Sequence, residues 1–189
     1  MSLTLIIALA VLIIAFLYGA AIYNNLVRLK HAVAKAWSNI DVVLKQRHDE
    51  LPKLVAVCRE YMRHEQQTLE QVVRARAAVS TARQRGDLRQ LGGAEGELRV
   101  GLDRLFALAE SYPELKADQA FQQLSRRISL LEDTIADRRE LYNDSVNLNN
   151  VRLQQLPDAL LARLFRFRPA ALLEFAKARQ DVDIAELFR

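Results

Sequence analysis

Histidine and glutamate are the residues of this chain whose spacing most resembles a known metal-binding motif. The run from His64 to Thr68 begins like the HExxH motif of zinc proteases, but Thr68 stands where the second histidine ligand is needed. The other histidines, His31 and His48, have no metal-ligating neighbour at a suitable spacing. The sequence therefore predicts no metal site.

Other catalytic and cofactor-binding patterns are also missing from the sequence. Glu60 and His64 lie four residues apart, whereas a di-iron bundle uses Glu-x-x-His pairs on two helices. Gly92, Gly93 and Gly96 lack the lysine that follows a phosphate-binding loop and the strand that precedes it. The sequence also contains no Gly-x-Ser-x-Gly nucleophile elbow. We expect no catalytic or cofactor-binding residue, and a protein that is not an enzyme.

Three charged residues lie in line with apolar helical stripes. They are Glu65, Arg76 and Arg138. A buried charge is costly unless it is paired, so we favour a buried polar seam in which Glu65 meets Arg138 or the neighbouring Arg139 and fixes the register of two helices. Two alternatives are a polar pocket that receives a partner or ligand, and hydrated helix ends.

The helices that position these residues are organised around the segment from Leu3 to Leu44. Residues 3–22 carry no charge and have the length of about 20 residues that a membrane-spanning helix needs. Residues 24–44 contain no Gly or Pro, and their apolar residues recur at spacings of three and four, which is typical of an amphipathic helix. We expect one helix to leave the membrane and become the first helix of a soluble bundle.

The residues that flank the apolar segment predict an uncleaved anchor and its orientation. The first charged residue is Arg28, so the basic start of a signal peptide is missing, although residues 19–21 could serve as a cleavage site. Only two residues precede the segment, whereas Arg28, Lys30 and Lys35 follow it. Positive charges usually stay in the cytoplasm. This predicts a single-pass protein with its N-terminus outside and residues 23–189 in the cytoplasm.

The soluble part is predicted to be an all-α, antiparallel four-helix bundle with coiled-coil packing. The first helix is expected to end near Pro52, where Asp49 could cap the next helix, or to continue with a kink. The second helix is expected at about 50–83, a glycine-rich loop at 85–96, and the third helix at about 97–112. The fourth is expected to run from an N-cap at Asp118 past residue 150 to Pro157.

In an up-and-down bundle, the fourth helix returns to the membrane and delivers the C-terminal segment there. Residues 160–168 carry Arg163, Arg166 and Arg168 between the aromatic residues Phe165 and Phe167. Basic amphipathic segments of this kind bind anionic membrane surfaces. We expect these five residues to contact the membrane surface, or else the apolar ones to close the end of the bundle.

Charge and cysteine content exclude two further classes of protein. The chain has 27 Lys and Arg against 23 Asp and Glu, but the excess is spread along the sequence, which argues against nucleic-acid binding. Cys58 is the only cysteine, so the chain forms no internal disulfide. It lies between Val55 and Met62 on an apolar stripe, which predicts a buried thiol.

Segments along nearly the whole chain resemble the LemA family. They are YNNLVRL at 23–29, AWSNIDVVLKQR at 36–47, LPKLV at 51–55, ESYPELKA at 110–117 and FQQL at 121–124, followed by YN at 142–143. The resemblance implies a bacterial inner-membrane protein with one N-terminal span, a cytoplasmic four-helix domain and no established catalytic activity. One departure is that residues 147–150 replace a second Tyr-Asn pair usual in the family.

We therefore divide the chain into an anchor, a bundle and a basic tail. Residues 1–23 form the N-terminus and anchor, 24–155 the LemA-like four-helix bundle, and 156–189 the amphipathic C-terminal segment. The predicted function is a scaffold or adaptor that meets the bilayer through residues 3–22 and binds an unidentified protein partner. The alternative is a lipid-responsive or membrane-shaping protein that acts through its tail. A homo-oligomer is compatible with the sequence, but no feature of the sequence indicates one.

Overall fold

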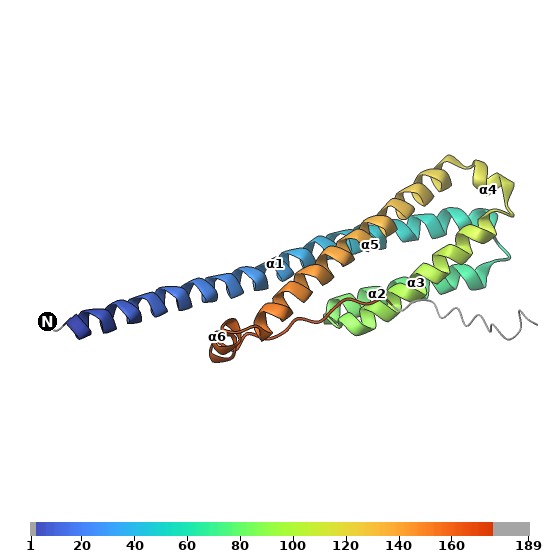
Figure 1. Ribbon diagram of the computed structural model, residues 1–189. Helices are drawn as coiled ribbons and strands as arrows, with labels where there is room; N and C mark the ends of the chain where they lie inside the picture. The colour runs from blue at the N-terminus through green and yellow to red at the C-terminus, as the bar shows by residue number, and fades with distance from the viewer. Residues whose placement is uncertain (1–2, 176–189) are drawn as a thin grey trace, which may run out of the picture. The chain divides into compact units, whose positions relative to one another are not determined.

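Every regular element among residues 3–175, the part of the chain that the computed structural model describes, is an α-helix (Figure 1). The helices are α1 (Leu3–Tyr61), α2 (Gln66–Arg85), α3 (Leu88–Ala109), α4 (Pro113–Ala117), α5 (Gln119–Gln154) and α6 (Asp158–Leu164). The all-α class and the long apolar first helix are thus confirmed. The antiparallel four-helix bundle stays a prediction.

Helices α1 and α5 each contribute to two compact units. The first unit contains residues 3–41 and 137–172, and the second contains residues 42–136 and 173–175 of the described chain. The first unit therefore holds the apolar start of α1, the end of α5 and the whole of α6. The predicted division into anchor, bundle and tail stays a prediction, and residues 176–189 of the tail lie outside the described residues.

The apolar start of α1 is almost entirely exposed. The large apolar side chains from Leu3 to Tyr18 are at least half exposed, and only 6% of the most apolar 18-residue window is buried. A continuous apolar surface of this size is unfavourable in water. Among the described residues, α1 is the one helix long and apolar enough to span a membrane.

Helix α6 packs on α1 where this apolar surface ends. Ile22, Leu26 and Ala162 form a buried cluster, and Leu161 and Phe167 pack against it. In the same unit, two hydrogen bonds join the extended segment after α6 to α5. The Asn150 amide donates to the carbonyl of Ala170 at 2.8 Å, and the Ala170 amide donates back to Asn150 Oδ1 at 2.9 Å. The departure from the family pattern at 147–150 thus includes a residue that holds this segment in place.

Of the two alternatives at Pro52, the helix end is wrong and the continuous helix is observed, because α1 continues through Pro52 to Tyr61. Proline lacks the amide hydrogen that would bond to the carbonyl four residues earlier, which here belongs to His48. The Nε of Arg76 in α2 donates to that carbonyl at 2.9 Å and replaces the missing bond. The turn between the two helices instead falls at residues 62–65.

The link between Arg76 and Pro52 gives a testable prediction. Arg76→Gln should lower the free energy of unfolding by about 1–3 kcal/mol, since the carbonyl of His48 loses its donor. In a Pro52→Ala background the alanine amide can bond to that carbonyl, so the same substitution should cost much less. Urea unfolding of the four proteins in detergent measures the difference. Equal costs in both backgrounds would refute the link.

The predicted glycine-rich loop at 85–96 is also wrong, since α2 and α3 form a helical hairpin with a two-residue turn (Figure 1). Gly86 ends α2 with φ at 66°, a left-handed conformation that suits glycine. Asp87 then caps α3 by accepting bonds from the amides of Arg89 and Gln90, both at 3.0 Å. The glycines from 92 onward lie inside α3, and Gly101 allows close packing there, because a Cβ at this position would lie 3.4 Å from Val72.

The predicted start of the last long helix is confirmed. Asp118 precedes α5 and accepts a bond from the amide of Phe121 at 2.9 Å, which is the N-cap interaction. The helix ends at Gln154, before Pro157. The predicted third helix is offset, because it spans Leu88–Ala109 and is followed by the short helix α4, which Pro113 begins.

Candidate functional site

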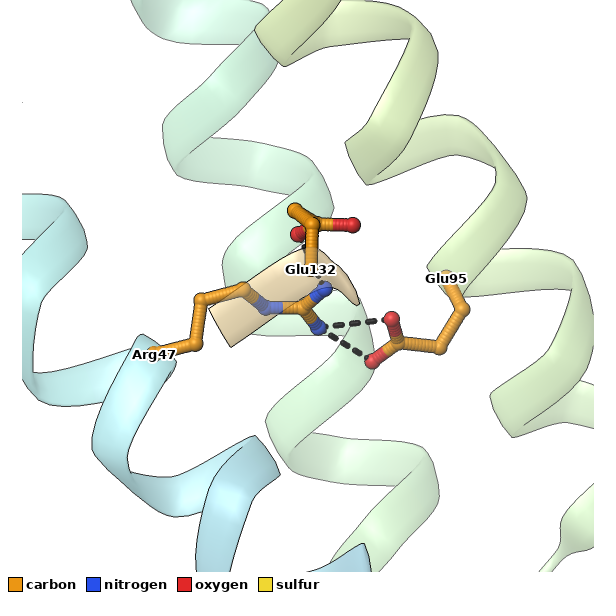
Figure 2. A network of polar contacts seen from close by, with 3 residues as sticks. All are labelled: Arg47, Glu95 and Glu132. Atoms are coloured by element: carbon orange, nitrogen blue, oxygen red, sulfur yellow. Dashed lines mark hydrogen bonds and ion pairs between the residues drawn. The ribbon is translucent and has the colours of Figure 1, made fainter. Parts of the chain in front are cut away.

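One buried arginine joins three helices of the second unit. Arg47 of α1 donates from Nη2 to both carboxylate oxygens of Glu95 in α3, each at 2.6 Å, and from Nη1 to Glu132 Oε1 in α5 at 2.5 Å (Figure 2). The side chains of Arg47 and Glu95 are each 1% exposed, and that of Glu132 is 25% exposed. Because the two ion pairs hold α1, α3 and α5 together, they fix the register of the three helices.

Burial dominates the electrostatics of this cluster. Burial raises the pKa of Glu95, although Arg47 opposes the shift. Burial by itself would lower the pKa of Arg47, but the charges and hydrogen bonds of the two glutamates outweigh it and raise the pKa. The guanidinium therefore stays charged. Because Arg47 and Glu95 are closed off from water, the cluster suits a structural role better than proton transfer to a substrate.

The residues predicted to form the buried polar seam lie elsewhere. Glu65 is half-buried and accepts a hydrogen bond from the Tyr112 hydroxyl at 3.3 Å. Arg76 is half-buried and donates a hydrogen bond to the carbonyl of His48. Arg138 is exposed. It lies at the edge of the α5 stripe, where a long side chain can place its charge in water. The prediction of a buried ion pair at these residues is therefore wrong, and Arg47 with Glu95 takes that place.

The predicted surface residues of the tail gather around a groove in the first unit. The groove has a volume of about 610 Å³, and its lining includes Tyr23, Lys30 and His31 from α1 and Phe165, Arg166 and Arg168 from the segment that follows α6. Tyr23 packs on Phe165 with ring centroids 4.8 Å apart and on Phe167 at 5.9 Å. The structure thus brings four of the five predicted tail residues to α1. Arg163 is exposed on α6.

The sequence left two alternatives for the apolar residues of the tail: they close the end of the bundle, or they contact the membrane surface. Leu161 and Ala162 pack on α1 and close the end of the unit. Leu160, Leu164 and Phe165 are each more than half exposed. Closing the end of the unit therefore describes Leu161 and Ala162, and contact of the exposed residues with a membrane stays a prediction.

Arg166 has an unusual backbone conformation at the edge of the groove. Its φ is 57°, and it ends α6 in a Schellman motif, with its amide donating to Arg163 O at 3.2 Å and the Phe167 amide to Ala162 O at 2.9 Å. Glycine is the usual residue at this position because a side chain costs about 1–2 kcal/mol there. The arginine is thus kept at a position where its backbone is strained.

The remaining reactive residues have structural surroundings. Cys58 is fully buried, as predicted, and burial raises the pKa of its thiol to about 12. His48 lies against Arg76, with 2.8 Å between His48 Nε2 and Arg76 Nη2. Its pKa is lowered, first by burial and then by the arginine charge, which favours the neutral ring. Within residues 3–175, no three His, Cys, Asp or Glu side chains are grouped so that they could hold a metal ion.

These features define a helical protein with one candidate membrane span, a polar cluster that joins three helices, and a basic aromatic groove next to the span. The model of the LemA family matches residues 36–185. The chain therefore belongs to the LemA family. The protein LemA of Metamycoplasma hominis is 26% identical over 167 residues, which cover 87% of this chain and 74% of that protein.

Magnetosome proteins are also similar to part of the chain. MamQ 1 and MamQ 2 of Paramagnetospirillum magneticum are each 32% identical over 85 residues, and MamQ of Magnetospirillum gryphiswaldense is 32% identical over 76 residues. The first two matches cover 45% of this chain but only 31% of each MamQ protein. The chain thus spans about a third of the length of these relatives.

Proposed function

We propose that the chain is a single-pass protein of the bacterial inner membrane that holds a non-enzymatic helical scaffold at the membrane surface. The observation that carries the proposal is the continuity of α1. Its residues 3–18 expose apolar side chains along the helix, and the same helix continues without a break to Tyr61. Such a helix would place the residues that directly follow its apolar part at the surface of the bilayer.

The proposed orientation places the N-terminus outside and the helical domain in the cytoplasm. It is supported by Arg28, Lys30 and Lys35, which follow the apolar residues directly. Two C-terminal fusions test it: a phosphatase that is active only in an oxidising compartment, and a fluorescent protein that matures only in the cytoplasm. We expect fluorescence without phosphatase activity. Phosphatase activity without fluorescence would reverse the orientation.

A scaffold needs a surface for a partner, and the end of α5 offers one. Leu141, Leu148 and Val151 lie on one side of the helix and are 56%, 58% and 42% exposed. Exposed apolar rows of this kind are typical of helix-mediated protein contacts. The partner would be a protein with a complementary apolar surface. The MamQ relatives are named as magnetosome proteins, but the match covers too little of them to extend that role to this chain.

Crosslinking in native membranes tests the scaffold role. The double variant Leu141→Glu/Leu148→Glu should lose the crosslinked partner bands of the wild type. The control Val100→Glu adds a charge at an exposed apolar position of another helix, α3, so it should keep them. If the double variant keeps every band, the surface is not the partner site.

The groove in the first unit favours a second candidate function, a response to membrane lipids. Arg166, Arg168, Phe165 and Phe167 belong to the basic tail, and the groove places them beside the residues that follow the apolar part of α1. In this function these four residues would contact the lipid headgroups.

A further inference from the structure

The basic groove of the first unit lies where the proposed membrane span ends. Tyr23 directly follows the apolar residues 3–22, and Lys30 comes eight residues after Ile22, about 12 Å along a helix. The headgroup layer on each side of a bilayer is about 5–8 Å thick. Side chains on a helix tilt toward its N-terminus, so Lys30 leans back toward the membrane. The groove would therefore open at the level of the headgroups.

The charges around the groove have one sign. Lys30, Arg166 and Arg168 line it, and no Asp or Glu is among its lining residues. Arginine binds phosphate through paired hydrogen bonds, and lysine through its point charge. Each cation near an anionic membrane strengthens binding about fivefold, so three together would contribute on the order of 100-fold.

The remaining surface of the groove suits the part of a lipid next to its phosphate. Tyr23, Phe165 and Phe167 pack together at one side, and Val27 and Val33 add apolar surface from α1. Such a wall can contact the glycerol and the first carbons of the acyl chains while the cations bind the phosphate. Arg166 adds its charge to the groove from a left-handed backbone position that glycine would occupy with less strain.

We propose that this groove binds the headgroup phosphate of one anionic phospholipid. The proposal rests on the membrane anchoring proposed above, since only an anchored chain would hold the groove at the headgroups. It assigns Lys30, Arg166 and Arg168 to the phosphate, and it makes the groove a lipid site rather than a general basic surface.

Retention of lipid by the full-length protein tests this site. The protein is reconstituted in nanodiscs of phosphatidylcholine with an increasing fraction of phosphatidylglycerol, released into mild detergent, and weighed by native mass spectrometry. We expect one phosphatidylglycerol per wild-type chain and no retained phosphatidylcholine. Arg166→Gly should weaken retention about fivefold, and the triple variant with Lys30→Gln and Arg168→Gln on the order of 100-fold.

Two variants separate lipid binding from folding. Arg166→Gly relieves the backbone at the end of α6, so it should unfold at an equal or higher temperature than the wild type while it binds less lipid. Arg163→Gln removes a cation of the same helix that is absent from the groove lining, so it should retain lipid like the wild type. Equal losses in Arg163→Gln and Arg166→Gly would overturn the site, because they would show binding to the tail as a whole.

Further outcomes distinguish the site from the anchor. Retention of phosphatidylcholine equal to that of phosphatidylglycerol would overturn the proposal, and so would displacement of the lipid by millimolar inorganic phosphate. Extraction of the wild type from native membranes by alkaline carbonate would overturn the anchoring instead. A chain that resists carbonate but shows no preference for phosphatidylglycerol leaves the anchor intact and refutes the lipid site.

Discussion

Replacing Arg47 with methionine is expected to lower the free energy of unfolding by about 3–5 kcal/mol. The substitution leaves Glu95 in the core, 1% exposed, without the guanidinium that neutralises its carboxylate. Glu132 loses the same partner but is 25% exposed, so water can replace part of the interaction. The loss should therefore arise mainly from Glu95. Urea unfolding of the full chain in mild detergent, followed by circular dichroism, measures it.

Two further variants show that the charge, and not the volume of the side chain, causes this loss. Glu132→Gln should cost much less than Arg47→Met, because the amide oxygen can still accept a bond from Arg47. The double variant Arg47→Met/Glu95→Met should recover most of the lost stability, since an apolar pair of similar size often replaces a buried ion pair at little cost. A double variant as unstable as Arg47→Met would contradict this explanation.

Gly92→Ala is expected to detach the segment around Leu173 from α3. A Cβ at Gly92 would lie 1.8 Å from the carbonyl oxygen of Glu174, a backbone atom that cannot move away unless the segment moves with it. Leu173 is fully buried, so its release exposes a large apolar side chain. We expect a loss of about 1–3 kcal/mol, together with faster proteolysis near residue 173.

The neighbouring glycine provides the matched control. A Cβ at Gly93 would have nothing within 4 Å, so Gly93→Ala should gain the helix preference of alanine, about 0.5–1 kcal/mol. Both changes add one methyl group, at consecutive residues of the same helix. The same shift in stability for both variants would mean that the contact at Gly92 has no effect.

Helical periodicity predicted the core well wherever the helix boundaries were right. Leu26, Ile40 and Leu44, which belong to the predicted amphipathic segment 24–44, are buried in α1. Caps were predictable for the same reason, since they depend on the nearest residues: Asp118 caps α5. Such local rules need no knowledge of the neighbouring helices.

Two wrong boundaries hid the buried ion pair from the sequence. Arg47 continues the spacing of Leu44 and Leu51, but it fell at the helix end that Pro52 was expected to cause. Glu95 continues the spacing of Leu91 and Leu98 in the same way, but it fell in the expected glycine-rich loop.

The error at Pro52 has a tertiary cause, whereas the error at the hairpin turn has a local one. Arg76, a residue of another helix, satisfies the carbonyl that Pro52 leaves free, and single-helix rules cannot anticipate that contact. The hairpin turn was visible in principle, because Gly86 followed by Asp87 pairs a typical helix end with a typical N-cap. The groove could not be predicted from the sequence alone, because it is formed by residues of α1 and by residues more than 110 positions later in the chain.

Immersion depth in a bilayer tests the central claim, a membrane span that holds the helical scaffold at the surface. Single spin labels at Leu12, Leu164 and Leu130 of the full chain in nanodiscs, with Cys58 replaced by alanine, report exposure to oxygen and to a water-soluble nickel chelate. The account predicts Leu12 in the hydrocarbon core, Leu164 at the headgroups and Leu130 in water. Full access of the nickel chelate to Leu12 would contradict it.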